Sequence, residues 1–388
     1  MDRLYLDNAA TSWPKPDVVY DAVDRFQRQL GASAGRGLYH SAQQASRLVT
    51  ETRAACARLL GIADTRQLLF TANGTAALNL AIHGLLSPGD HVVTTVCEHN
   101  SILRPLHWQV EQNSVQVTQV GCDAVGFVDP AAIAEAISPK TRLIAVTHAS
   151  NVTGAIQPIA EIAQIAHDAN AFILVDAAQT AGCVPVDVAK LDIDLLACGG
   201  HKGLLGPTGT GLLYLRPELN EQLHTLVQGG SGTDSLSHTP PDQLPEKYEA
   251  GSLNTLALAG LGAAAKYLEQ QTVAAVQAHH NELTRQLLDG LAKIPTATVF
   301  GPTADQPRVA VVSCTIDGYD PQEFAAALDA SCGIECRAGL HCAPRMHTAL
   351  GTANTGGTLR LSPGWSTTAE DIGTALEAIA ALASMPVH

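Results

Sequence analysis

Short apolar runs alternate with amphipathic stretches along the first half of the chain. The runs are rich in aliphatic and β-branched residues and have the length of buried strands. After Thr75, apolar residues fall at i, i+3, i+4 and i+7, the spacing of a helix that packs one face on a sheet. This alternation predicts an α/β fold with a mostly parallel sheet and helices on both faces. The predicted strands are residues 67–70, 91–96, 142–147, 171–175 and 194–198.

The two ends of the chain have other patterns. Residues 4–7 predict a short strand that leads into a turn, and residues 17–30 and 41–60 are helical in pattern. A long helical stretch, 256–294, precedes short strands and two further helices, which together predict a small α+β domain. We therefore expect an N-terminal segment (1–16) that packs near the functional site, a large domain (17–255), and bridging helices with a small C-terminal domain (256–388).

Charge and composition exclude several classes of protein. The chain of 388 residues has 23 basic and 37 acidic residues and a net charge of −14, which argues against nucleic acid or an anionic membrane as a partner. No apolar run approaches the roughly 18 residues that span a bilayer. The first residues lack the apolar core of a signal peptide, so we expect a cytoplasmic protein. Nine cysteines, an odd number spread over a long chain, do not suggest a disulfide framework.

Chemistry-bearing residues follow two of the predicted strands. Asp176 follows the run 171–175, and the run 194–198 leads into Gly199-Gly200-His201-Lys202. Open α/β sheets bind ligands at the carboxyl ends of their strands. A lysine that binds an aldehyde, an acid that keeps a pyridine nitrogen protonated, and glycines that admit close backbone approach suit pyridoxal 5′-phosphate (PLP). The structural alternatives are a helix-capping aspartate and a solvated lysine.

Three further segments could contact a ligand. Gly74 and Thr75 stand where a helix begins, a place that binds anions but that can also be a simple cap. His99 follows the strand 91–96 and is either a proton-transfer group or a satisfied hydrogen-bonding residue. Ala9 and Ala10 are small enough to let backbone lie against a substrate.

Taken together, these segments resemble the class V aminotransferase family, whose lysine follows a histidine in a Gly/Ser-His-Lys context, and the resemblance extends over nearly the whole chain. It implies the PLP-dependent transferase fold type I, with a mostly parallel seven-stranded sheet and a small α+β C-terminal domain. It also implies a homodimer with shared active sites. The implied roles are phosphate binding by Gly74 and Thr75, ring stacking by His99, cofactor or carboxylate contact by Asn151, pairing of Asp176 with the pyridine nitrogen, a bond from Gln179 to the ring hydroxyl, cofactor contact by His201, attachment at Lys202, and contact of Ser252 with the phosphate in the neighbouring subunit.

The segment 334–344 resembles the Arg-x-Gly-His-His-Cys-Ala segment of group II cysteine desulfurases and selenocysteine lyases. The resemblance makes Cys342 the nucleophile, and Arg360 the fork for the substrate carboxylate, with Arg337 a second active-site arginine and Ala9 and Ala10 beside the substrate. Two positions depart from the family pattern, because Leu340 replaces the first histidine and Gly199 replaces the usual serine.

The reaction implied by this resemblance is the conversion of L-cysteine to L-alanine, with a persulfide left on Cys342. L-selenocysteine is the alternative substrate. The sulfur would pass to an acceptor protein, as in iron–sulfur cluster assembly.

Several other interpretations stay open. The chain could be a class V aminotransferase, lyase or epimerase that does not use the cysteine, or a non-catalytic PLP-binding or sulfur-relay scaffold. Cys342 could be a small buried hydrophobe. A zinc site is suggested by Cys332, Cys336, His341, Cys342 and His347, but paired C-x-x-C spacing is lacking, so we expect no metal. The other cysteines, among them Cys97 and Cys122, are interpreted as packing residues.

Overall fold

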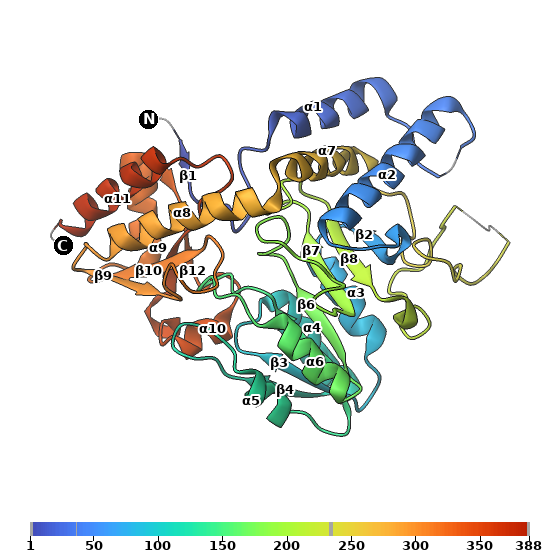
Figure 1. The fold of residues 1–388 in the computed structure, drawn as a ribbon, viewed down its shortest axis with the longest axis horizontal. Helices are drawn as coiled ribbons and strands as arrows, with labels where there is room; N and C mark the ends of the chain where they lie inside the picture. The colour runs from blue at the N-terminus through green and yellow to red at the C-terminus, as the bar shows by residue number, and fades with distance from the viewer. Residues whose placement is uncertain (1–2, 36, 233–235, 386–388) are drawn as a thin grey trace.

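A seven-stranded sheet forms the centre of the larger part of the molecule (Figure 1). The computed structural model describes residues 3–35, 37–232 and 236–385. Five neighbouring strands are parallel, whereas β8 is antiparallel to both of its neighbours, so the predicted mostly parallel α/β fold is confirmed. In spatial order the strands are β2 (Leu68–Thr71), β8 (Gly211–Leu215), β7 (Leu195–Gly199), β6 (Phe172–Asp176), β5 (Thr141–Thr147), β3 (His91–Thr95) and β4 (Gln116–Val120).

Alternate residues of the central strands face two different apolar layers. Leu174 of β6 packs in the layer that contains α3 (Gly74–Leu85) and α4 (Asn100–Asn113). Its neighbours Ile173 and Val175 pack in the opposite layer, which contains α6 (Ile159–Asp168) and α5 (Pro130–Glu135). Burial on both faces explains why these strands are continuous apolar runs in the sequence.

A second sheet organises the C-terminal part of the chain. It is antiparallel, in the order β12 (Arg337–Gly339), β13 (Thr358–Leu361), β10 (Val312–Ile316) and β9 (Ala297–Phe300). Its apolar residues pack against α9 (Pro321–Cys332) and α11 (Ala369–Ala383) through side chains such as Phe324 and Ile379. The short helix α10 (Pro344–Ala349) follows β12.

The long helical stretch predicted at 256–294 is two helices. α7 (Thr255–Gln271) packs on α1 (Asp17–Arg25) and α2 (His40–Leu59), while α8 (Val273–Leu291) packs on α11. Thr272 separates them with a φ of 63°, and its side chain accepts a hydrogen bond from the Ala275 N–H of α8. A single left-handed residue therefore redirects the chain from one sheet to the other.

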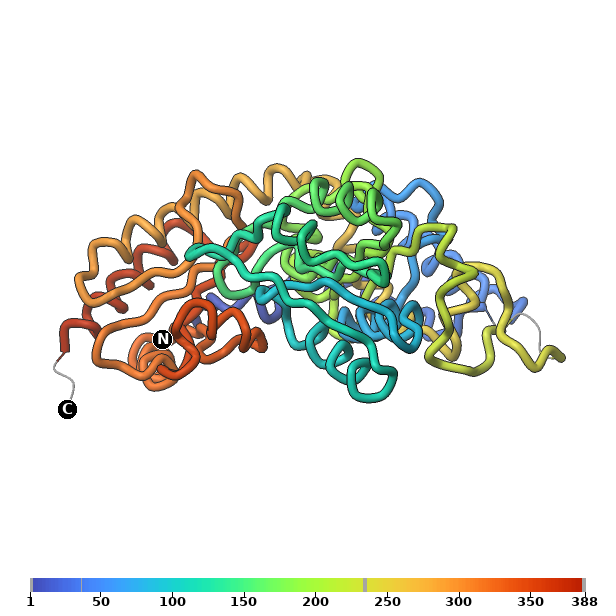
Figure 2. Tube along the Cα trace, turned by 90° about the horizontal axis from the view of Figure 1, so that it is seen from below, coloured from blue at the N-terminus to red at the C-terminus, as the bar shows by residue number. Residues whose placement is uncertain are grey.

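The N-terminal segment joins the C-terminal sheet region to the large sheet. β1 (Leu4–Tyr5) pairs in parallel with β11 (Ile334–Glu335), which places the start of the chain beside its C-terminal third (Figures 1 and 2). Farther on, the Ser12 N–H donates to the carbonyl of His201 at 3.0 Å. Residues 5–12 therefore run directly past the ends of β6 and β7.

The predictions missed helix α4 and two strands of the large sheet, β4 and β8. Helix α4 and strand β4 occupy the interval 100–120, and β4 lies at the edge of the large sheet. Gln116, Thr118 and Gln119 of β4 are polar and at least partly exposed, so this strand lacks the apolar pattern of a buried one. Among the helices of the described residues, none has both the length and the hydropathy needed to cross a bilayer.

Candidate active site

One cavity collects most of the residues predicted to contact a cofactor. It lies where β5, β6 and β7 end, and it is also lined by residues from the beginnings of α3 and α4. Chain segments from Asn73 to Lys202 thus meet at the carboxyl edge of the sheet, as expected for this fold. Its predicted lining residues are Gly74, Thr75, His99, Asn151, Asp176, Gln179, His201 and Lys202.

Lys202 and Asp176 are brought together by neighbouring parallel strands. Asp176 ends β6 and Lys202 follows β7, and the two side chains influence each other's charge. Burial lowers the pKa of the Lys202 ammonium, an effect that the Asp176 charge opposes. Burial likewise raises the pKa of Asp176, against a hydrogen bond from the Ala178 N–H at 2.9 Å. The cavity therefore holds an amine with an enhanced neutral, nucleophilic fraction and a buried acid that lacks a close cationic partner.

The part of the cavity at the start of α3 can bind an anion. Helix α3 begins at Gly74, and although Asn73 caps the Ala76 N–H at 2.9 Å, the N–H groups of Gly74 and Thr75 and the helix dipole favour negative charge. A Cβ at position 74 would lie 3.0 Å from the Gly199 nitrogen, so only glycine lets the helix approach β7 this closely. The hydroxyls of Thr75 and Ser101 are 2.8 Å apart. Ser101 was missed by the sequence analysis, although it stands in the first turn of the helix after His99.

His99 is held as a neutral imidazole. Its Nδ1 accepts a hydrogen bond from the Ser101 N–H at 3.0 Å, which leaves the proton on Nε2. Burial, reinforced by the positive charges of Lys202 and Arg337, lowers the pKa of His99 to about 4. The ring therefore remains uncharged at neutral pH and can stack on an aromatic ligand.

The adjacent Glu98 is fully buried beneath the cavity. Its Oε1 accepts hydrogen bonds from the Thr95 hydroxyl at 2.6 Å and the Thr147 N–H at 3.1 Å, while Oε2 lacks a partner. Burial raises the pKa of Glu98 to about 8, against these two hydrogen bonds. The protonated acid thus braces the turn that carries His99. The sequence showed the Glu-His pair, but nothing in it indicated that the glutamate is buried.

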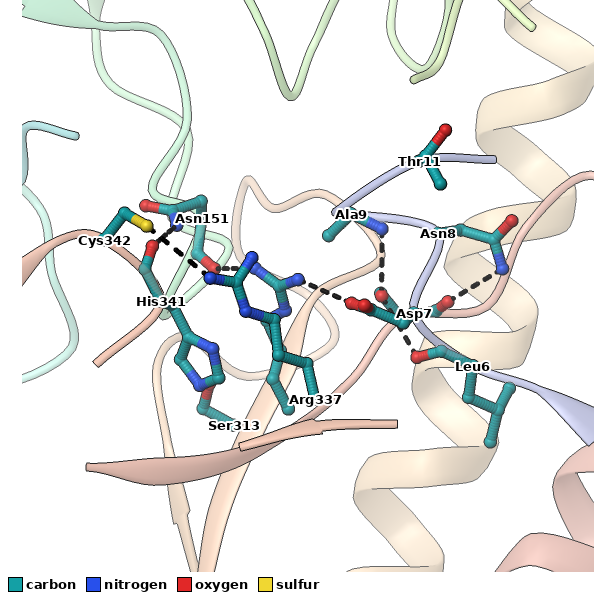
Figure 3. A network of polar contacts seen from close by, with 12 residues as sticks. Leu6, Asp7, Asn8, Ala9, Thr11, Asn151, Ser313, Arg337, His341 and Cys342 are labelled. Atoms are coloured by element: carbon teal, nitrogen blue, oxygen red, sulfur yellow. Dashed lines mark hydrogen bonds and ion pairs between the residues drawn. The ribbon is translucent and has the colours of Figure 1, made fainter. Parts of the chain in front are cut away.

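The predicted nucleophile stands on a strained loop between β12 and α10. His341 and Cys342 both have left-handed backbone, with φ of 48° and 58°. The Cys342 carbonyl accepts a hydrogen bond from the Asn100 N–H at 2.7 Å, which docks the loop on the start of α4 next to His99. Arg337 Nη2 lies 3.5 Å from Cys342 Sγ (Figure 3). The thiol therefore faces a guanidinium.

His341 holds this loop against β13 through a hydrogen bond. Its Nε2 donates to the Thr358 carbonyl at 3.0 Å, and its Nδ1 lacks a partner. Burial, with help from nearby arginines, lowers the pKa of His341 to about 2. The adjacent Leu340, which replaces a histidine of the family pattern, has 39% of its surface exposed.

Arg360 was predicted to bind a substrate carboxylate through its guanidinium group. In this structure both terminal nitrogens of that group already have partners. Nη2 donates to Asp7 Oδ1 at 2.7 Å and Nη1 donates to the Asn151 carbonyl at 3.1 Å. The side chain is 1% exposed, and its Nε lacks a partner. The Asn151 amide in turn donates to the His341 carbonyl at 2.6 Å. Asp7 was not singled out in the sequence, where it resembles an ordinary strand end.

The remaining predicted residues, Ala9, Ala10 and Ser252, do not line this cavity. Ala9 lines a second, smaller cavity on the other side of Lys202, and its carbonyl accepts a hydrogen bond from Gln179 at 3.1 Å. Ala10 lies in the turn that follows Asp7, with its N–H bonded to the Asp7 carbonyl. Ser252 is exposed and lines a separate groove, so in a single chain it does not reach the site.

The cavity fits PLP. It brings together the start of a helix, a buried acid and a lysine, and the buried His201 Nδ1 lacks a protein partner. A metal centre has less support, because in the described part of the chain no three His, Cys, Asp or Glu side chains come together as ligands.

The chain is similar to known proteins over nearly its whole length. The model of the aminotransferase class-V family matches residues 4–374. A probable cysteine desulfurase of Methanothermobacter thermautotrophicus is 36% identical over 98% of this chain and 96% of its own. A cysteine desulfurase of Haloferax volcanii is 33% identical over 90% of this chain and 83% of its own.

Solved structures agree with these relatives. The apo cysteine desulfurase of Thermococcus onnurineus superimposes with a TM-score of 0.91 at 32% identity, covering 98% of this chain and 94% of the other. A cysteine desulfurase of Escherichia coli gives a TM-score of 0.87 at 30% identity, covering 97% and 94%.

Proposed function

The chain belongs to the aminotransferase class-V family, as its motifs predicted, and from that premise we propose that it is a PLP-dependent cysteine desulfurase whose nucleophile is Cys342. The substrate is L-cysteine and the products are L-alanine and a persulfide on the enzyme. The observation that carries the assignment of residues is the docking of the Cys342 loop on the first residue of α4, beside His99 and the cavity that holds Lys202 and Asp176.

The cavity residues divide the task of holding the cofactor. Lys202 would bind its aldehyde, Asp176 would keep its ring nitrogen protonated, and the start of α3 with Thr75 would hold its phosphate. His99 would stack on the ring, while Gln179 and His201 would contact its substituents. PLP supplies an electron sink that stabilises negative charge on the substrate α-carbon.

Lys202 and His99 suit proton transfer at this site. Because burial lowers the pKa of Lys202, it enlarges the neutral fraction of Nζ, the form that can accept a proton from the substrate α-carbon. The neutral His99 presents Nε2–H to the cavity and can donate it as charge develops. Asn151 and Arg360 orient the substrate through its carboxylate.

Sulfur transfer is the task of the Cys342 loop. The Cys342 thiolate attacks the substrate sulfur, the carbon–sulfur bond breaks, and a sulfur–sulfur bond forms on the enzyme. Arg337 faces the sulfur at 3.5 Å and balances its negative charge. The left-handed backbone at residues 341 and 342 holds the thiol away from the strand, where substrate and an acceptor protein can reach it.

The test is a Cys342→Ala variant supplied with PLP and L-cysteine. We expect the visible absorbance of the bound cofactor to persist, while alanine production and enzyme-bound persulfide are lost. Cys332→Ala, which removes a partly buried thiol of α9, is the matched control and should retain turnover. Normal alanine production by Cys342→Ala would favour a class V enzyme that does not use this cysteine. Absence of turnover by the parent chain with L-cysteine, L-selenocysteine or other amino acids would instead favour a non-catalytic scaffold.

The active unit we propose is a homodimer. Ser252 is exposed in a groove with Leu226 and Tyr248, apart from its own subunit's cavity. In a dimer this hydroxyl would contact the phosphate bound by the neighbouring subunit, and each site would then be built from two chains.

A further inference from the structure

Two cysteines that the reaction does not use lie together at the end of the large sheet. β3 and β4 are parallel, and their last paired residues are Thr95 and Val120. The pairing continues beyond the strands, because the Val96 N–H donates to the Val120 carbonyl at 2.9 Å. Two residues beyond the last pair of these strands, Cys97 therefore lies opposite Cys122. Neighbouring strands lie about 4.8 Å apart, within the Cα separation of about 4.4–6.8 Å that a disulfide needs.

The side chains of the two residues also interact. Cys97 and Cys122 are both free thiols, and each shifts the pKa of the other. Cys97 Sγ also lies 3.7 Å from the Gly126 carbonyl, which keeps it on the side of the loop that contains Cys122. The strand register and the interaction of the two thiols both indicate that a disulfide can form without a rearrangement of the sheet.

We propose that Cys97 and Cys122 form a modification site, a dithiol that a hydroperoxide oxidises to a reversible disulfide beside the active site. This inference concerns a different pair of sulfurs from Cys342 and does not depend on the proposed catalytic roles.

The environments of the two sulfurs determine which thiol reacts first with the oxidant. Cys122 is partly exposed, and its interaction with Cys97 lowers the pKa of its thiol, so it is the more accessible and more readily ionised of the two sulfurs and meets the oxidant first. Cys97 is 1% exposed, and the same contact, together with burial, raises its pKa. Cys56 and Cys314, by contrast, are fully buried and burial raises the pKa of each to about 12, which leaves them unreactive.

The chemistry balances with hydrogen peroxide as the oxidant. The Cys122 thiolate attacks one peroxide oxygen, the O–O bond breaks, and a sulfenic acid and one water result after protonation. The Cys97 sulfur then attacks the sulfenic sulfur, the S–O bond breaks, and a second water leaves with the Cys97 proton. The two thiols lose two electrons in total, and peroxide is reduced to two waters.

The site is connected to the catalytic cavity through one turn. The Cys97 N–H donates to the Thr95 hydroxyl at 3.0 Å, and this hydroxyl donates to Glu98 Oε1 at 2.6 Å. His99 is the next residue. A bond between Cys97 and Cys122 therefore fixes the turn from which His99 enters the cavity.

The test uses the full-length PLP-loaded chain with Cys342→Ser, since Cys342 is itself open to oxidation. The protein is treated with hydrogen peroxide, free thiols are alkylated, and the denatured chain is cut after glutamate residues. Glu98 and Glu111 separate Cys97 from Cys122, whereas trypsin would leave both in one peptide because Pro105 follows Arg104. We expect a cross-linked pair of peptides that contain Cys97 and Cys122, with the loss of two alkylatable thiols per chain and their return with dithiothreitol.

Single variants in the same background identify the sulfurs. Cys122→Ser should abolish the cross-link, and Cys97→Ser should leave a sulfenic acid on Cys122 that dimedone traps. Cys183→Ser, which removes another partly exposed thiol, should leave the cross-link unchanged. The proposal is overturned if the folded parent oxidises Cys122 directly to sulfinic or sulfonic acid without a cross-link, or if the cross-link survives in Cys97→Ser. Cofactor absorbance and circular dichroism equal to the parent's show that the variants are folded.

Discussion

Asp7 Oδ1 accepts a hydrogen bond from Arg360 Nη2 at 2.7 Å, which joins the N-terminal segment to the buried arginine of β13. The Asp7 side chain is 20% exposed and that of Arg360 is 1% exposed, so the arginine depends on this carboxylate for its charge balance. Asp7 thus occupies a position on Arg360 that a substrate carboxylate could also use. Before or during substrate binding the two carboxylates compete for one guanidinium.

Removal of the Asp7 charge should therefore strengthen substrate binding and weaken the fold. For Asp7→Asn we expect KM for L-cysteine to fall about fivefold, the effect of about 1 kcal/mol of relieved repulsion. The free energy of unfolding should fall by about 1–3 kcal/mol, less than for a fully buried pair because Asp7 is partly solvated. Steady-state kinetics and urea denaturation measure the two effects.

Glu335→Gln is the matched control for that experiment. It breaks the exposed pair between Glu335 of β11 and Arg3, which precedes β1; their side chains are 35% and 45% exposed. KM should stay unchanged, and the free energy of unfolding should change by less than about 1 kcal/mol. A rise of KM in Asp7→Asn would mean that Asp7 orients Arg360 for the substrate and does not compete with it.

Glu98 should make stability depend on pH in the neutral range. Its pKa is raised from 4.5 to about 8 by burial, so the folded chain binds a proton that the unfolded chain releases between these values. Glu98 therefore penalises folding increasingly as pH rises from about 4.5 to about 8, with the full penalty above that range. Relative to the parent, Glu98→Gln should gain stability from pH 5 to pH 8, as measured by urea denaturation. A constant difference across this range would contradict a raised pKa in the folded state.

Gly74→Ala should disturb both the fold and the cofactor. The added Cβ would lie 3.0 Å from the Gly199 nitrogen, and backbone on both sides cannot give way easily. We expect a loss of about 1–3 kcal/mol of unfolding free energy and weaker retention of PLP in dialysis. Gly373→Ala in α11 is the control, because its Cβ would meet no atom within 4 Å, and the helix should gain up to about 1 kcal/mol. Equal retention of PLP by the two variants would argue against the start of α3 as the phosphate site.

Mixed dimers test whether Ser252 completes the neighbouring site. Lys202→Ala subunits cannot attach the cofactor, and Ser252→Ala subunits should hold it more weakly in the partner's cavity. A mixed dimer of the two variants combines one intact lysine with an intact Ser252 from the other chain, so one site of parental affinity should reappear. Spectral titration with PLP measures it. If mixing restores no tight site while dimers form, Ser252 does not act across the interface.

Local sequence patterns determined much of the fold and of the cavity. Parallel strands buried on both faces must be continuous apolar runs, so β3, β5, β6 and β7 could be located from hydrophobicity alone. Ligand sites in such sheets lie at the carboxyl ends of the strands, where Asp176, Lys202 and His99 stand. Patterns of this kind fail for an edge strand such as β4, whose exposed polar residues carry no apolar signal.

Contacts between distant segments were decided only by the tertiary structure. Asp7 and Arg360 are 353 positions apart, and nothing near either residue indicates the other. Cys97 and Cys122 meet only because β3 and β4 share a register, and Thr272 divides a stretch that has uniform helical composition. The sequence thus determined which residues lie at strand ends, because a buried strand is a continuous apolar run whose end can be located in the sequence itself. Strand register and the contacts between distant segments decided which residues become partners, because both depend on how the whole chain folds.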